Sequence, residues 1–421
     1  SPRTRDARRW LAERARRLRG APHRVLYFHQ ADDPYGQLAA QALGELVRRY
    51  DVELAPRLVG PPPDDAAPER ARLEAFARRD AADVAPGYGL AFPAADAPDP
   101  DDVALANRIL AAGLADADFP ALAVRTGAAL WRRDRGALEA MAANAAPQAA
   151  ARAALDAGNR ERARRGHYLG AMLHYGGEWY WGVDRLHHLE RRLAVLGARR
   201  PGAPADPIAP RPDPSREPAR AGAGRGIVLE FYASLRSPYS YVAMERSYAL
   251  AARYGVELAL RPVLPMVMRG LPVPAAKRLY ITLDTKREAD DAGVPFGRVC
   301  DPVGRPVERA FSLWPHARAA GAGPAYLLSF ARAAFAEGVD TGTDAGLRCV
   351  AERAGLDWER ARADLDREGW RDELERNRAQ LLALGLWGVP SYRVQGGGRP
   401  DYATWGQDRL WRVEQEIRAR L

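Results

Sequence analysis

The sequence has few cysteines and no long apolar run, and each of these absences excludes a class of protein. Among its 421 residues are two cysteines, Cys300 and Cys349, which excludes a disulfide-stapled scaffold, a four-cysteine zinc site and a Cys-X-X-Cys redox pair. No apolar run approaches the roughly 20 residues that a membrane-spanning helix needs, and residues 1–20 lack the apolar region of a secretory leader. We therefore expect a protein of a reducing compartment, the cytoplasm, with no membrane partner.

Lysine is almost missing as well. Only Lys277 and Lys286 occur, so the net charge of +9 and the pI near 9.7 come from arginine. Acidic residues are interleaved with the arginines along most of the chain, and we expect no nucleic-acid partner although a basic charge could favour one. Residues 1–22 are the exception, because arginines dominate there. This segment is expected to be a solvated basic helix, with contact to an acidic partner as the alternative.

Histidines are few and unevenly placed. Of the seven in the chain, six lie in the first half: His23, His29, His167, His174, His187 and His188. Their spacing fits no standard metal-binding motif, so surface or packing roles are expected and no metal is predicted.

The length indicates two domains. Residues 200–225 carry Pro or Gly at nearly every second or third position, which predicts a linker. The sequences on its two sides resemble each other: each begins with a short strand, a turn ending in Pro-Tyr, a helix and a strand starting Val-Glu-Leu. Each also ends with the related segments 181–186 and 405–410, both of the form Trp-Gly-X-Asp-Arg-Leu. The boundaries expected for the two domains are 23–199 and 226–421.

The second half gives the order of elements. A β-α-β start is followed by a stretch of helical periodicity up to residue 386, then by strands at 391–394 and 402–405 around three glycines, and by a closing helix. This order describes a small mixed sheet with an inserted helical subdomain, as in thioredoxin-like proteins. The fold class expected is therefore α/β, with two such domains.

Four features of the second half could carry chemistry. The first is Ser237, at the start of the helix after the first strand. In the simpler of two interpretations, its side chain is a helix N-cap and has no further role. In this topology, however, the same helix start favours an anion, including a thiolate.

The second feature is the turn Gly388-Val389-Pro390. A proline cannot serve a central strand ladder, so Pro390 marks a sheet edge or a cis peptide in a tight bend. A cis bond would turn the backbone of Val389 outward, where it could pair with an extended peptide. The simpler alternative is a helix stop followed by a strand.

The remaining features are two helical segments. Gln407 and Asp408 lie in the first turn of the last helix, where they could receive the amino and carboxylate ends of a small peptide or be ordinary N-terminal helix residues. The second segment places four residues on one helical face, which is either part of a site or a salt-bridged surface: Lys277, Tyr280, Asp284 and Arg287.

In combination, these motifs resemble the 2-hydroxychromene-2-carboxylate isomerases and the kappa-class glutathione transferases, of the DsbA-like branch of the thioredoxin superfamily. The resemblance covers residues 226–421 and rests on the segments 237–241, 388–390 and 405–410 and on the Lys277 face.

The resemblance implies a glutathione site. Ser237 matches the serine that hydrogen-bonds the glutathione sulfur, and Val389, beside Pro390, matches the residue whose backbone pairs with the cysteinyl part. Gln407 and Asp408 match positions that bind the γ-glutamyl end, and Lys277 matches a basic residue at the mouth. Aromatic residues expected near the substrate are Tyr239, Tyr241 and Trp405.

The function implied is a glutathione-dependent isomerase or transferase for a small unsaturated carbonyl or aromatic-derived substrate. The alternative is a non-catalytic thioredoxin-like module that binds an extended peptide or protein partner. The first domain departs from the motifs: Asp33 stands where Ser237 is expected, and 169–172 lacks Gly-Val-Pro. We expect it to be a degenerate copy, which forms an intrachain pseudo-dimer with the second domain or belongs to a homodimer.

Overall fold

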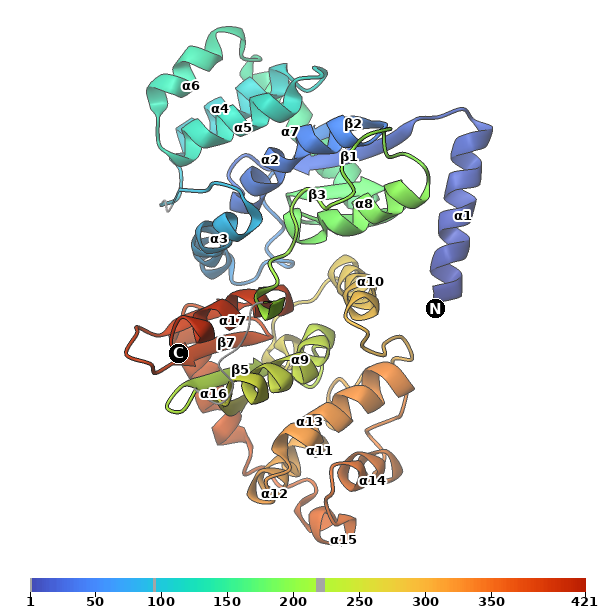
Figure 1. The fold of residues 1–421 in the computed structure, drawn as a ribbon, viewed down its shortest axis with the longest axis vertical. Helices are drawn as coiled ribbons and strands as arrows, with labels where there is room; N and C mark the ends of the chain where they lie inside the picture. Colours follow the sequence, from blue (N-terminus) through green and yellow to red (C-terminus); the bar gives the residue numbers. More distant parts are fainter. Residues whose placement is uncertain (1, 94–95, 217–223) are drawn as a thin grey trace. The chain divides into compact units, whose positions relative to one another are not determined.

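The computed structural model describes all residues except 1, 94–95 and 217–223. The chain divides into two units, Ser1–Pro212 and Asp213–Leu421, each with its own four-stranded sheet (Figure 1). The predicted linker, 200–225, lies partly outside the described residues. Its earlier part is held on the first unit, where the N–H of Ile208 donates to the carboxylate of Glu190 at 3.1 Å.

Helices and strands of the first unit agree with the predicted order. They are α1 (Pro2–Leu18), β1 (His23–His29), α2 (Pro34–Arg49), β2 (Val52–Leu58), α3 (Arg70–Val84), α4 (Pro100–Ala112), α5 (Phe119–Trp131), α6 (Arg135–Met141), α7 (Gln148–Arg164), β3 (Met172–Tyr175), β4 (Glu178–Trp181) and α8 (Leu186–Val195).

The second unit has a larger helical insert. Its elements are β5 (Val228–Ala233), α9 (Pro238–Tyr254), β6 (Glu257–Pro262), α10 (Ala275–Asp291), α11 (Arg305–Ser312), α12 (Trp314–Ala319), α13 (Gly323–Arg332), α14 (Asp344–Arg353), α15 (Trp358–Ala361), α16 (Arg371–Ala383), β7 (Ser391–Gln395), β8 (Tyr402–Trp405) and α17 (Leu410–Arg418).

The two sheets have the same topology, with strand orders β2-β1-β3-β4 and β6-β5-β7-β8. In each, the first two strands in the chain pair in parallel through a helical crossover, and the other pairs are antiparallel. The β7–β8 register sets Ser391 opposite Trp405, and the N–H of Gly406 donates to Pro390 O at 2.9 Å. The predicted α/β class and order of elements are confirmed.

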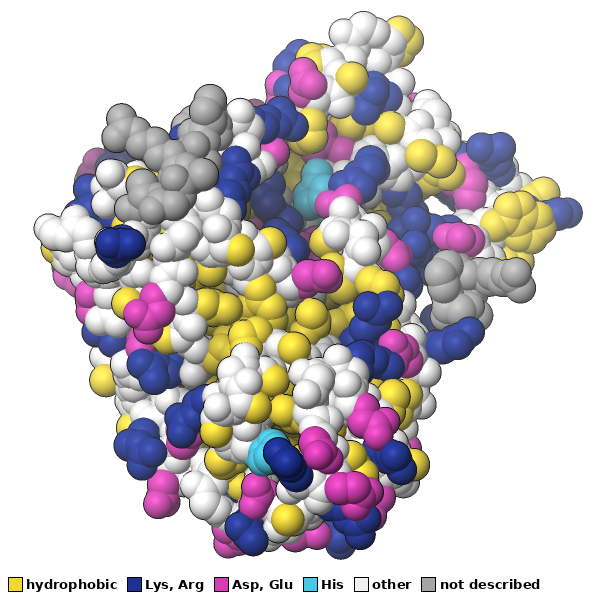
Figure 2. Space-filling view, turned by 60° about the horizontal axis from the view of Figure 1, so that its bottom comes forward, with side chains coloured by type: hydrophobic (Ala, Val, Ile, Leu, Met, Phe, Trp, Pro, Cys, Tyr) yellow, Lys and Arg dark blue, Asp and Glu magenta, His cyan; other side chains and the backbone are white. Residues whose placement is uncertain are grey.

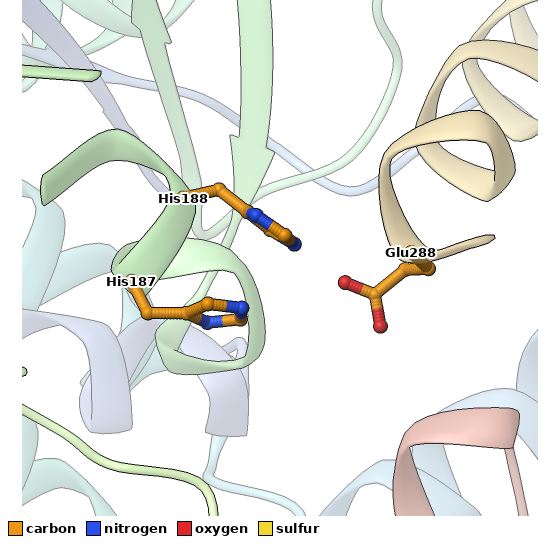
Figure 3. A group of neighbouring side chains, drawn as sticks. All are labelled: His187, His188 and Glu288. Atoms are coloured by element: carbon orange, nitrogen blue, oxygen red, sulfur yellow. The ribbon is translucent and has the colours of Figure 1, made fainter. Parts of the chain in front are cut away.

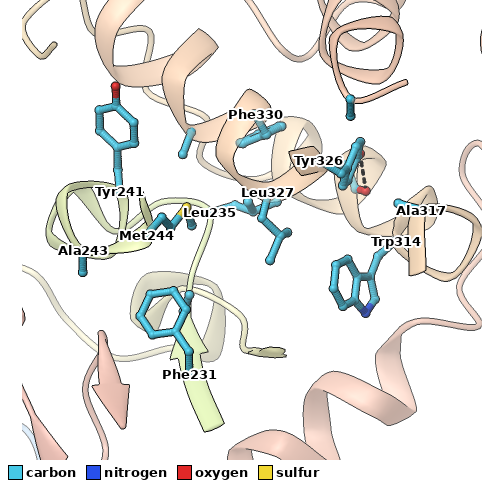
Figure 4. Packing of buried hydrophobic residues seen from close by; sticks show 14 of the residues in the cluster. Phe231, Leu235, Tyr241, Ala243, Met244, Trp314, Ala317, Tyr326, Leu327 and Phe330 are labelled. Atoms are coloured by element: carbon cyan, nitrogen blue, oxygen red, sulfur yellow. Dashed lines mark hydrogen bonds between the residues drawn. The ribbon is translucent and has the colours of Figure 1, made fainter. Parts of the chain in front are cut away.

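The core of the second unit joins the sheet to the helical insert. Phe231 on β5, Met244 on α9 and Leu327 on α13 belong to one cluster of buried side chains (Figure 4). Within the insert, the hydroxyl of Tyr326 donates to Ala310 O at 2.7 Å, so this buried phenol is satisfied. Because α9 packs in this core, the position of its first turn relative to the sheet is fixed.

Charge is spread rather than gathered on the face drawn in Figure 2, where dark blue basic side chains alternate with magenta acidic ones. Within the described ranges, every helix is too short or too polar to span a bilayer.

Candidate functional site

Ser237 lies between the end of β5 and the start of α9. Its Oγ accepts a hydrogen bond from the N–H of Ser240 at 3.1 Å, which makes it the N-cap of α9. The same hydroxyl points at Val389, whose carbonyl oxygen lies 3.5 Å away, a distance that gives at most a weak hydrogen bond. The capping interpretation is therefore correct, and it leaves the O–H proton of Ser237 directed toward the Gly-Val-Pro turn.

The Gly388-Val389-Pro390 turn contains a cis Val389–Pro390 peptide bond. Among the residues that the structure describes, no hydrogen-bond partner is present for the N–H of Val389. Gly388 is required by close approach, because a Cβ at this position would overlap the indole of Trp405. Ser237 and Val389, which are 152 residues apart in the chain, therefore form one half-buried site.

An ion pair that was not predicted stabilises the turn before Ser237. Arg236 donates from Nε and Nη2 to the two carboxylate oxygens of Asp301, at 2.8 and 2.7 Å. Such bidentate pairs fix direction as well as distance. Arg236 was visible within the turn motif, but nothing in the local pattern indicated a partner 65 residues away.

The predicted face of α10 is partly internal. The hydroxyl of Tyr239 donates to Asp284 Oδ2 at 2.7 Å, and Arg287 donates to Asp284 Oδ1 at 3.2 Å. Asp284 and Arg287 are both buried, and Tyr280 is buried too. The alternative of a salt-bridged surface is therefore right about the ion pair and wrong about the surface.

Aromatic rings line the region beside Val389. The ammonium of Lys277 lies 5.6 Å from the ring centre of Trp387, within the range of a cation–π contact. Trp387 in turn lies 5.3 Å from Trp405, centre to centre. Trp387 was not among the predicted site residues, although it directly precedes Gly388 in the sequence. Lys277 and Trp405 are thus brought together through this residue.

Gln407 and Asp408 are buried at the start of the last helical segment. The Gln407 amide donates to Glu288 Oε2 at 2.6 Å and accepts from Arg246 Nη1 at 3.1 Å. Neither Glu288 nor Arg246 was predicted to belong to the site. Both ends of the Gln407 amide are used within the protein, so its orientation is fixed.

Tyr241 does not lie with the other predicted aromatic residues. It is 3% exposed, and its ring stacks on Phe335 with centres 5.9 Å apart. Its hydroxyl donates to Pro295 O at 2.9 Å, and burial raises its pKa to about 12. Tyr241 is thus placed in the core between α9 and the helical insert.

The first unit has Asp33 at the start of α2, in the place of Ser237. Its carboxylate caps the helix by accepting from the N–H of Tyr35 at 2.9 Å. Burial raises the pKa of Asp33 to about 7. Opposite it, Ala171 stands where Pro390 does, with a positive φ of 52°, and Gly182 N donates to Ala171 O at 2.8 Å. The backbone arrangement at this place is therefore the same in the two units, but the side chains differ.

Two histidines of the first unit are neighbours on α8. His187 and His188 have ring centres 4.0 Å apart. Figure 3 draws them with Glu288, which belongs to α10 of the second unit. The histidine pair belongs to the first unit and Glu288 to the second, and no metal site is assigned to either.

A family model supports the class of protein that the fold and site indicate. Residues 228–418 match the DSBA-like thioredoxin domain. The second unit is therefore a DSBA-like thioredoxin domain. No curated protein is similar enough in sequence to count as a match.

Solved structures resemble parts of the chain. A 2-hydroxychromene-2-carboxylate isomerase is 22% identical, with 45% of this chain and 94% of that chain covered and a TM-score of 0.38. The cytosolic disulfide reductase DsbM from Pseudomonas aeruginosa, also solved with GSH, is 22% identical over 46% of this chain and 98% of that one, with a TM-score of 0.37. DsbA from Xylella fastidiosa is 15% identical over 49% and 91%, with a TM-score of 0.30. The domain assignment rests on the family match, since these scores are low.

Proposed function

We propose that the second unit is a glutathione-dependent isomerase or transferase for a small unsaturated carbonyl or aromatic-derived substrate, with Ser237 stabilising the glutathione thiolate. The observation that carries this proposal is the approach of the Ser237 Oγ, at the start of α9, to within 3.5 Å of the carbonyl oxygen of Val389, whose own N–H has no hydrogen-bond partner among the described residues. A hydroxyl donor next to a helix N-terminus forms a suitable environment for a thiolate, and the neighbouring backbone donor can bind another part of the same ligand.

The residues at this turn fit a small thiol better than a protein thiol. No cysteine occurs in 234–241, so the reacting sulfur has to be brought by a ligand. Ser237 would turn its O–H from Val389 O to that sulfur, and the Val389 N–H would donate to the cysteinyl carbonyl of glutathione. When bound, the thiol supplies the nucleophile for addition to an unsaturated carbon.

The ends of glutathione would be held by the neighbouring groups. Asp408 provides a carboxylate for the γ-glutamyl ammonium, and Gln407 is oriented by Glu288 and Arg246. Lys277 would add positive charge at the mouth, beside the indole of Trp387. Tyr239 and Trp405, both half-buried, would border the second substrate.

The second candidate function is a non-catalytic module that binds an extended peptide. The observation in its favour is again the Val389 N–H, which can pair with any peptide carbonyl. The two functions differ in whether the ligand needs a thiol. A peptide module has no use for a hydroxyl that lowers the pKa of a ligand sulfur, whereas the enzyme depends on it.

The test is calorimetric titration of the full chain with glutathione, together with the ultraviolet absorbance of the bound thiolate. We expect Ser237→Ala to weaken binding about tenfold, the effect of one hydrogen bond to a charged group, and to remove the thiolate signal. Asp408→Ala should weaken binding and retain the signal. Asp33→Ala, at the matching position of the first unit, is the control and should change neither quantity.

Two outcomes would contradict the enzyme. The absence of binding at millimolar glutathione would exclude the glutathione site. Binding of glutathione and of S-methylglutathione with equal affinity, and without a thiolate signal, would favour the peptide-binding module.

A further inference from the structure

Helix α1 of the first unit is attached through polar side chains. Arg9 donates from Nε and Nη2 to both carboxylate oxygens of Glu178 on β4, at 2.6 and 2.8 Å. Arg16 donates to Ala21 O at 2.7 Å and to Glu13 at 2.7 and 2.9 Å, and Arg16 lowers the pKa of Glu13 to about 2. The bonds of Arg16 are local to the helix and the turn after it, so the Arg9–Glu178 pair shows which side of α1 faces the sheet of its own unit.

The opposite side of α1 is apolar and exposed. The exposed fractions of Trp10, Leu11 and Leu18 are 57, 58 and 78%. Leu11 and Leu18 are two helical turns apart and share one face, and Trp10 lies beside Leu11. A surface helix of a globular protein normally buries this face and exposes its polar one. In α1 the arrangement is reversed, so the described residues of the first unit leave this stripe of apolar side chains without cover.

Arginines border this stripe, and Arg14 lies within it, one helical turn from Trp10, Leu11 and Leu18. The exposed basic residues of the segment are Arg8, Arg14, Arg17 and Arg19. The Arg14 guanidinium lies over the Trp10 ring at 5.2 Å, and Arg17 is paired with Glu13. Among the side chains of α1 that the structure describes, the exposed acidic one is Asp6. In Figure 2 the segment projecting at the right, where Figure 1 has α1, shows yellow and dark blue side chains together.

We propose that α1 lies on the surface of an anionic lipid bilayer, with Trp10, Leu11 and Leu18 in the interface and the bordering arginines at the lipid headgroups. A basic amphipathic helix with Trp and Leu on its apolar side has the composition of interfacial helices. A second copy of this chain is a poor occupant, because the arginines of two such helices would repel each other. A nucleic acid would attract the arginines but leave the apolar stripe without a role.

This inference revises the expectation of no membrane partner. That expectation rested on the absence of an apolar span, and a helix that lies in the interface does not need one. It is independent of the glutathione site, because every residue that carries it belongs to the first unit.

The test is co-sedimentation of the full chain with phosphatidylcholine vesicles, prepared with and without phosphatidylglycerol, at physiological ionic strength. We expect binding to the anionic vesicles only. Two variants should each lose about 100-fold in affinity, since each basic residue near an anionic surface contributes about 1 kcal/mol: Trp10→Ser/Leu11→Ser/Leu18→Ser, which removes the stripe, and Arg8→Gln/Arg14→Gln/Arg17→Gln, which removes the charge. The control is Leu279→Ser/Leu283→Ser on α10, an exposed apolar pair (59 and 52%) away from α1 in sequence, which should bind as the wild type does.

Three results would overturn the proposal. The first is no preference for anionic vesicles. The second is unchanged binding of the serine triple variant, which would mean attraction by charge alone. The third is that the chain binds polyglutamate but no vesicles, and that both triple variants lose the binding of polyglutamate. This result would mean that the partner of α1 is an acidic protein. Circular dichroism of each variant verifies that the fold is intact.

Discussion

The first and second units contain the same hydrogen bonds at matching places. Tyr35 donates to Asp80 at 2.8 Å in the first unit, and Tyr239 donates to Asp284 at 2.7 Å in the second. In both pairs the residues are 45 positions apart. A further pair agrees as well, with Tyr50 and Glu190 at 3.4 Å matching Tyr254 and Glu414 at 2.7 Å. Together with the identical strand order, these bonds support the hypothesis of a tandem copy.

The units differ in how they accommodate ionisable groups in the interior. The first holds several of them in their neutral forms: burial lowers the pKa of His29 and His174 to about 4 and raises that of Asp33 to about 7. The second pairs them: Glu230, which is buried, accepts from Arg261 at 2.6 and 2.9 Å. Neutralisation and pairing are the two ways to avoid an uncompensated buried charge. Stability should therefore depend on pH differently in the two units.

The largest effect expected is loss of the first unit's stability in acid. His29, His167 and His174 have pKa values of about 4, 3 and 4 because of burial. In the unfolded chain, histidine takes up a proton near pH 6.5, so stability is complete above that pH and is lost as the pH falls toward 4. At pH 5 each histidine should cost about 2 kcal/mol. Hydrogen exchange, corrected for intrinsic rates, should show the first unit opening before the second.

Asp33 acts against this loss of stability in acid, and its substitution provides the control. Its folded pKa of about 7 lies above the unfolded value, so the penalty of ionising it disappears as the pH falls from 7 to 4. Asp33→Asn keeps the helix cap and removes this compensation, so the acid sensitivity should increase by about 2 kcal/mol at pH 5. Equal loss of protection in both units would contradict the comparison.

The next effect concerns the residue by which the two sites differ most. Ser237→Asp places the first unit's carboxylate in the second unit, where it would repel a bound thiolate. We expect about 100-fold weaker glutathione binding by calorimetry, a larger loss than for Ser237→Ala. The reciprocal Asp33→Ser should create no binding, because Ala171, with a positive φ, stands where the second unit has the cis-proline Pro390. If Ser237→Asp and Ser237→Ala bind equally, no thiolate lies at this position.

The sequence was sufficient for the order of strands and helices in the second unit, because periodicity and caps located the strands and α9. Ser237 and Val389 were assigned to one site only through the family resemblance, and the structure places them close together because the end of β5 lies next to the start of β7. The partners of Gln407 could not be predicted, because Glu288 and Arg246 lie 119 and 161 positions away. Tyr241 was predicted at the substrate, but it shares a helical face with Met244, and that face is core.

The smallest effect expected comes from the Tyr–Asp hydrogen bond that both units contain. It tests whether this bond contributes only to stability or also to glutathione binding. Tyr35→Phe and Tyr239→Phe each remove one hydroxyl donor from a buried aspartate, so each should lower the free energy of unfolding of its own unit by about 1 kcal/mol. Only Tyr239→Phe lies two residues from Ser237, and we expect it alone to weaken glutathione binding, by about threefold. Arg287 still holds Asp284 in that variant, so α10 should stay in place. Equal effects of both variants on glutathione binding would mean that the bond acts only through the fold, and that Tyr239 has no contact with the ligand.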